Sequence, residues 1–73
     1  MSINYEATFK QGFEAGQRLY ARFPDYQLPK LRKEAEAETS RQDLPMVLQV
    51  HYKDGFVAGY VAKKQEGERS STT

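Results

Sequence analysis

A short element that occurs twice constrains the fold of this chain more than any other feature. Residues 9–16 read FKQGFEAG and residues 52–59 read YKDGFVAG, so Lys, Gly, Phe, Ala and Gly stand at the same places in both copies. Each copy opens with an aromatic residue and carries two glycines four positions apart. Residues four apart lie on one face of an α-helix, so each copy predicts a helix with a bare glycine face.

The first copy lies within a clear helical period. Aromatic side chains recur at steps of three, four or seven residues, which places them on one stripe of a helix over residues 5–22. Ser2 or Asn4 can cap the start of this helix, and Pro24 ends it. The stripe is formed by Tyr5, Phe9, Phe13, Tyr20 and Phe23.

The middle segment predicts a short, charged helix over about 29–40. Pro29 suits a first helical turn, and the run that follows it is rich in good helix formers. Lys30 and Glu34 stand four apart with opposite charges, a pairing that favours the helix by about a few tenths of a kcal/mol. We therefore expect an exposed helix that connects the two copies of the repeat.

Residues 46–62 admit two interpretations. The repeat favours a helix over about 44–64, because the same element lies inside a helical period in the first copy. Taken by itself, however, this segment contains two β-prone runs that flank Asp54-Gly55, and Asp-Gly is a strong signal for a two-residue hairpin turn. We favour the helix and keep the hairpin as the alternative.

These elements predict an all-α fold, a small two- to three-helix bundle in which the two GFxAG helices pack closely. The chain is long enough for one small domain, over residues 1–64. The polar and small residues of 65–73 are expected to form a disordered tail. The alternative is an α+β fold with a carboxyl-terminal β-hairpin at Asp54-Gly55.

Four glycines inside helices are costly for so small a domain. Each lowers helix stability by about 0.8 to 1 kcal/mol relative to Ala. Packing the two bare faces against each other offsets this cost, because backbones can approach closely where side chains are missing. The same faces can instead form a docking groove for a partner helix or an RNA backbone. Helix-packing or docking residues are therefore predicted at Gly12, Phe13, Gly16, Gly55, Phe56 and Gly59.

Composition narrows the classes of function. The chain has 11 basic and 10 acidic residues, so no strong field draws it to a polyanion. It has no Cys, a single His without a surrounding ligand cluster, and no recognisable nucleophile beside a base. We therefore expect no enzyme activity, no metal or other cofactor, and no small-molecule substrate. Neither a leader nor a membrane-spanning run is evident, so a cytoplasmic protein is expected.

Tyrosines and basic side chains supply the candidate contacts with a partner. Tyrosines at the edges of the apolar stripes can anchor a protein interface. These are Tyr20, Tyr26 and Tyr60. Basic side chains of the middle and last segments can touch phosphates if the partner is RNA. These are Lys30, Arg32, Lys33, Lys63 and Lys64.

A short part of the chain resembles a known family. Residues 7–16 resemble the first helix of the bacterial ribosome modulation factor family, which has a similar Gly-aromatic-x-Ala-Gly element. A second Gly-aromatic segment follows in that family, as Gly55-Phe56 does here. The resemblance implies a ribosome- or RNA-associated factor.

The residues themselves favour a small non-catalytic binding protein of a regulatory or adaptor type. Such a protein acts through contact with another protein or with a second copy of itself. A chain of this size buries only about 60% of its unfolded surface, so a partner, a homodimer included, can complete its core. Association with RNA is the alternative, and it would weaken steeply with added salt.

Overall fold

Three α-helices make up the computed structural model, which describes residues 4–71 of the chain. They are α1 (Tyr5–Arg22), α2 (Leu28–Arg41) and α3 (Met46–Ser71), and no strand occurs among the described residues. The predicted all-α fold with two closely packed GFxAG helices is confirmed. The alternative β-hairpin at Asp54-Gly55 is wrong, because α3 runs through this dipeptide without a break.

The sequence marks both the start and the end of α1. The side chain of Asn4 accepts a hydrogen bond from the backbone N–H of Ala7 at 2.9 Å, which caps the first turn. At the other end the N–H of Phe23 donates to the carbonyl of Leu19 at 2.8 Å, and Pro24 follows. The cap and the proline together set the length of the helix.

α2 packs on the rest of the molecule through a narrow stripe. Leu31, Ala35 and Thr39 are buried at steps of four residues, whereas most of the charged residues between them are exposed. The hydroxyl of Thr39 donates to the carbonyl of Ala35 at 2.6 Å, which satisfies this buried polar group. After α2 the chain reverses at Asp43, whose φ of 51° lies in the left-handed region that ends many helices.

α3 is longer than the sequence predicts. The repeat suggests an end near residue 64, followed by a disordered tail over 65–73. In the structure the helix continues to Ser71, and residues 72–73 lie outside the described part of the chain.

Two contacts accompany the extension of α3. The ammonium of Lys63 and the carboxylate of Glu66 form an ion pair at 3.6 Å, at the spacing that favours a helix. Gly67 lies against the hydroxyl of Tyr20 on α1. The last turns of α3 therefore have local and tertiary support that a polar composition alone does not reveal.

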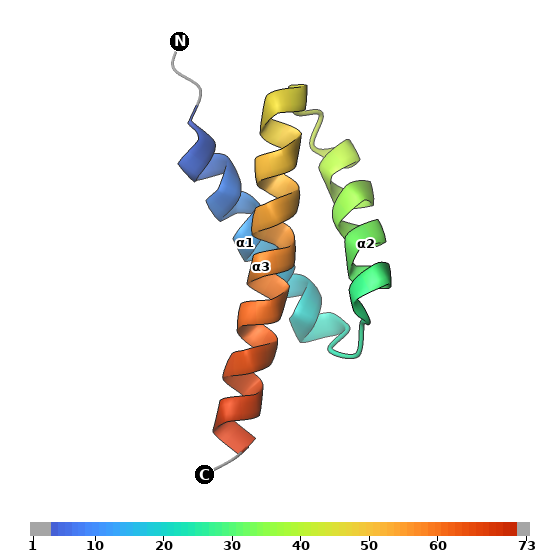
Figure 1. Cartoon of the computed structure of the whole chain (residues 1–73), viewed down its shortest axis with the longest axis vertical. Helices are drawn as coiled ribbons and strands as arrows, with labels where there is room; N and C mark the ends of the chain where they lie inside the picture. Colours follow the sequence, from blue (N-terminus) through green and yellow to red (C-terminus); the bar gives the residue numbers. More distant parts are fainter. Residues whose placement is uncertain (1–3, 72–73) are drawn as a thin grey trace.

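α3 is the central element of the fold (Figure 1). α1 crosses it on one side and α2 runs along another, so both shorter helices contact α3. The carboxyl-terminal turns of α3 project beyond the loop that joins α1 to α2 (Figure 1).

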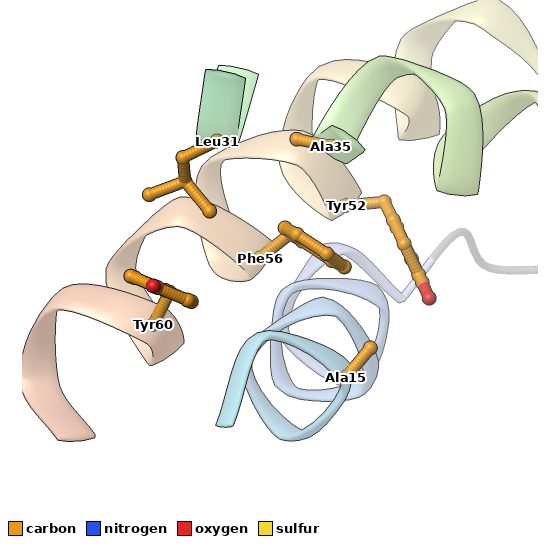
Figure 2. Close-up of a cluster of buried hydrophobic side chains, with 6 residues drawn as sticks. All are labelled: Ala15, Leu31, Ala35, Tyr52, Phe56 and Tyr60. Atoms are coloured by element: carbon orange, nitrogen blue, oxygen red, sulfur yellow. The ribbon is translucent and has the colours of Figure 1, made fainter. Parts of the chain in front are cut away.

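The buried hydrophobic side chains gather where the three helices meet. Figure 2 shows Phe56 of α3 between α2, which carries Leu31 and Ala35, and α1, which carries Ala15. Partly buried side chains such as Leu19 surround this cluster. Its members are Ala15, Leu31, Ala35, Tyr52, Phe56 and Tyr60.

Candidate interaction surfaces

Four glycines bring α1 and α3 into backbone contact. A Cβ atom added at Gly12 or Gly16 would lie closer than 3.0 Å to the backbone of α3. One added at Gly55 or Gly59 would lie equally close to the backbone of α1. Real Cβ atoms essentially never come so near to other atoms. The two bare faces therefore cover each other within one chain.

The phenylalanines of the two repeats lie beside this crossing in different surroundings. Phe56 is 3% exposed and packs with Leu31 and Ala35 of α2. Phe13 is half-buried, and its ring centre lies 6.3 Å from that of Phe9. The two copies thus share the helix crossing, while α2 covers only the second of the two phenylalanines.

Tyr60 ties the loop between α1 and α2 to α3. Its hydroxyl donates to the carbonyl of Phe23 at 2.6 Å and accepts from the backbone N–H of Tyr26 at 2.9 Å. The ring centres of Tyr20 and Tyr26 lie 5.3 and 6.2 Å from that of Tyr60. Burial raises the pKa of the Tyr60 hydroxyl, and the hydrogen bond from Tyr26 acts in the opposite direction.

The three tyrosines that the sequence predicts as interface anchors differ in exposure. Tyr60 is 1% exposed, which leaves it no surface for contact with a partner. Tyr20 and Tyr26 are half-buried and pack against the core. The sequence does not reveal this difference, because the partners of the Tyr60 hydroxyl are backbone groups of a distant loop.

A cleft of about 350 Å³ opens between α1 and α2. Two of its charged residues act on the pKa of Tyr52: burial raises this pKa, the carboxylate of Glu38 raises it further, and Arg18 lowers it. Glu38 also pairs with Arg41 at 2.6 Å. The positive and negative charges of the lining therefore partly cancel, and the cleft is not uniformly charged. The charged residues that line the cleft are Arg18, Arg22, Glu34, Glu38 and Arg41.

The five basic residues of the RNA-binding alternative lie in different surroundings. The ammonium of Lys30 lies 4.9 Å from the centre of a tyrosine ring, and that of Lys63 pairs with a carboxylate of its own helix. Arg32 lines a groove between α2 and α3. Lys33 and Lys64 are exposed on separate helices. Three of these five side chains lie on α2 and two lie on α3.

The side of α3 that faces away from α1 is apolar and only partly covered. Val47 and Val50 are 52% and 54% exposed. Val57 and Val61 are partly buried at the edge of the core, and Asp54 among them is exposed. We refer to these five residues as the outward face of α3.

A groove of about 600 Å³ runs between α2 and the outward face. Val50, Val57 and Val61 contribute apolar side chains to its lining. Charges of both signs stand beside them. These charged residues are Arg32, Glu36, Lys53 and Asp54.

The outward face is not evident from the local sequence. Its four valines sit in two runs that read as β-prone, and the Asp-Gly pair between the runs strengthens that reading. The signal that identifies the face is the spacing of its members along α3, which alternates between three and four residues and is a helical period.

No protein-family model, curated protein or solved structure matches this chain. Among the described residues, no helix combines the length and the hydrophobicity that crossing a membrane requires. Nor, in that part of the chain, do three or more His, Cys, Asp or Glu side chains come together as metal ligands would. The functional inference therefore rests on the surfaces of the molecule itself.

Proposed function

We propose that this chain is a small non-catalytic protein-binding module, of a regulatory or adaptor type, that works in the cytoplasm through protein–protein contact. The observation that carries this proposal is the outward face of α3, an apolar strip that the other two helices leave partly uncovered.

Exposure of the outward face to water is energetically unfavourable. Fully burying a valine side chain contributes roughly 1.5 to 3 kcal/mol, and Val47 and Val50 have about half of that still to gain. Apolar residues lie nearly all round α3 over residues 46–62, and helical segments of this kind are normally covered on every side. Because α1 and α2 cover two sides, a partner on the third would complete the burial.

The charges beside the groove suit a protein more than a nucleic acid. Arg32 and Lys53 are balanced there by Glu36 and Asp54, and the formal net charge of the whole chain is only +1. Binding to RNA depends on basic groups that neutralise several phosphates. Apolar side chains bordered by charges of both signs are typical of protein interfaces, where the charges give specificity.

Site-specific photo-cross-linking in cells tests the proposal. A photoreactive residue in place of Val50 should form covalent adducts with protein, because this side chain lies on the outward face. The matched control is the same residue in place of Glu14, which is exposed on α1. Adducts with RNA from Val50 would favour a ribosome- or RNA-associated factor instead. Absence of any adduct specific to Val50 would contradict a protein-binding role for this face.

A further inference from the structure

The outward face of α3 continues into a longer seam. Its members recur at alternating steps of three and four residues, the spacing of the contact positions in coiled coils. Residues at these steps lie along one side of a helix, and the next step after Val61 adds one charged residue. The seam consists of Val47, Val50, Asp54, Val57, Val61 and Lys64.

The seam is open to a neighbouring helix. Gly55 and Gly59 turn the other side of α3 towards α1. Asp54 and Lys64 are both exposed, and the groove beside α2 gives access to the valines between them. The carboxyl-terminal turns of α3 project past the loop between α1 and α2 (Figure 1). A second helix can therefore lie along the seam without displacing α1 or α2.

The charges of the seam complement those of a second copy of the same chain. Asp54 stands three residues before Val57, and Lys64 stands three residues after Val61. The two charges are therefore equally far from the midpoint of the two valines. When two such helices pack antiparallel about this midpoint, Asp54 of each copy lies opposite Lys64 of the other. Val57 of each copy then packs against Val61 of the other.

A parallel pair would oppose like charges, because it places Asp54 against Asp54 and Lys64 against Lys64. We infer that the partner of the outward face is a second copy of this chain, packed antiparallel along the seam. The inference rests on the proposed function, since it names the partner of the same face. Two-fold symmetry makes every contact occur twice, as in most homodimers.

The antiparallel pairing also brings the turns of α3 after residue 64 to the groove of the other copy. Lys64 of one copy comes to lie opposite Asp54 of the other, and Asp54 lines the groove between α2 and α3. Glu36 of α2 supplies a second carboxylate to that groove. The same register places Glu68 of one copy opposite Val50 of the other, in a groove whose lining also includes the basic residues Arg32 and Lys53.

Charge reversal in the full chain tests this inference. Sedimentation equilibrium between about 10 µM and about 1 mM should show a reversible dimer. Asp54→Lys and Lys64→Asp each turn two attractions into two repulsions, so each should weaken dimerisation by about 10-fold or more. The variant that combines Asp54→Lys with Lys64→Asp restores opposite charges and should recover most of the original affinity. Glu14→Lys makes the same charge change outside the seam and should leave dimerisation unchanged.

Cysteine cross-linking gives a second readout that does not depend on the reversals. The chain has no Cys of its own. The double variant Asp54→Cys, Lys64→Cys should form a disulfide-linked dimer under mild oxidation, because the two positions face each other. Either single variant should not, since its two identical positions lie about 15 Å apart along the antiparallel pair.

Several outcomes would overturn the inference. They are a chain that stays monomeric to about 1 mM, a dimer that neither reversal weakens, and single-cysteine variants that cross-link as well as the double variant. Photo-cross-linking from Val50 separates these failures from failure of the proposed function. If the chain is monomeric and Val50 captures a different protein, the proposed function stands and the second copy is excluded. If Val50 captures nothing, both are rejected.

Discussion

Replacing Gly59 with alanine should lower the free energy of unfolding by about 2 kcal/mol. The new Cβ atom would meet the O, C and Cα atoms of Phe13, all closer than 3.0 Å and all part of the α1 backbone. Backbone atoms cannot turn aside as a flexible side chain can, so α1 and α3 must separate locally. A gap of about 1 Å forfeits roughly a quarter to a half of the dispersion attraction between the atoms that face it.

Two opposing effects set the size of this loss. Overpacking of a well-packed contact costs about 1 to 3 kcal/mol, and a Cβ atom this close to three backbone atoms belongs at the upper end of that range. Alanine is favoured over glycine inside a helix by about 1 kcal/mol, which offsets part of that cost. A chain of this length has roughly 4 to 11 kcal/mol of stability in total. A net loss of about 2 kcal/mol should therefore lower the melting temperature by roughly 10 °C.

Gly67→Ala is the matched control, because Gly67 lies in the same helix without facing the α1 backbone. A Cβ atom there would meet the hydroxyl of Tyr20 at 3.2 Å, which is the far end of a flexible side chain. This variant should keep its stability or gain up to about 1 kcal/mol. Urea and thermal unfolding, followed by far-ultraviolet circular dichroism at one protein concentration, measure both variants. Equal stability of the Gly59 and Gly67 variants would refute the backbone contact.

Tyr60→Phe should lower the free energy of unfolding by about 1 to 3 kcal/mol in urea titrations, because the carbonyl of Phe23 and the N–H of Tyr26 lose their shared partner; an unchanged midpoint would contradict this. Alkali should also destabilise the fold, since burial raises the pKa of Tyr60 and Tyr52 above the ordinary 10.0. Their contribution is complete below pH 10.0 and is lost as pH rises through the folded-state pKa, so a flat stability profile above pH 10.0 would count against it. Asp43→Val should cost about 1 to 2 kcal/mol and Asp43→Asn far less, because a β-branched side chain tolerates positive φ poorly; equal melting temperatures would exclude strain at this turn.

The crossing of α1 and α3 can be predicted from the sequence, because what determines it is local. The aromatic period identifies the first helix, and glycines four apart identify the face on which it can be approached. Because the same element recurs at residues 52–59, α3 is also predicted to be a helix with a bare glycine face. It also outweighs the hairpin signal, since Gly55 is typical of a turn in isolation but here lies at a backbone contact with Phe9.

Other features depend on groups that are distant in sequence. The two hydrogen-bond partners of the Tyr60 hydroxyl lie 34 and 37 residues away, so its burial has no local signature. The helical turns after residue 64 have a polar composition, yet Gly67 lies beside the hydroxyl of Tyr20 on α1. As for the candidate site, the sequence predicts the glycine faces as a packing or docking surface. The spacing of its members places the outward face on one side of α3, but only the positions of α1 and α2 show that this side stays partly uncovered.

The two copies of the repeat differ most on the side that faces away from their crossing. Where α3 has Val57, α1 has the exposed Glu14 at the same place in the repeat. α1 makes the same glycine contact with a charged residue there, so the crossing does not require valine. Packing near the core accounts for Val57, which is partly buried, but not for Val47 and Val50, which are more than half exposed. A partner that covers the outward face accounts for all three.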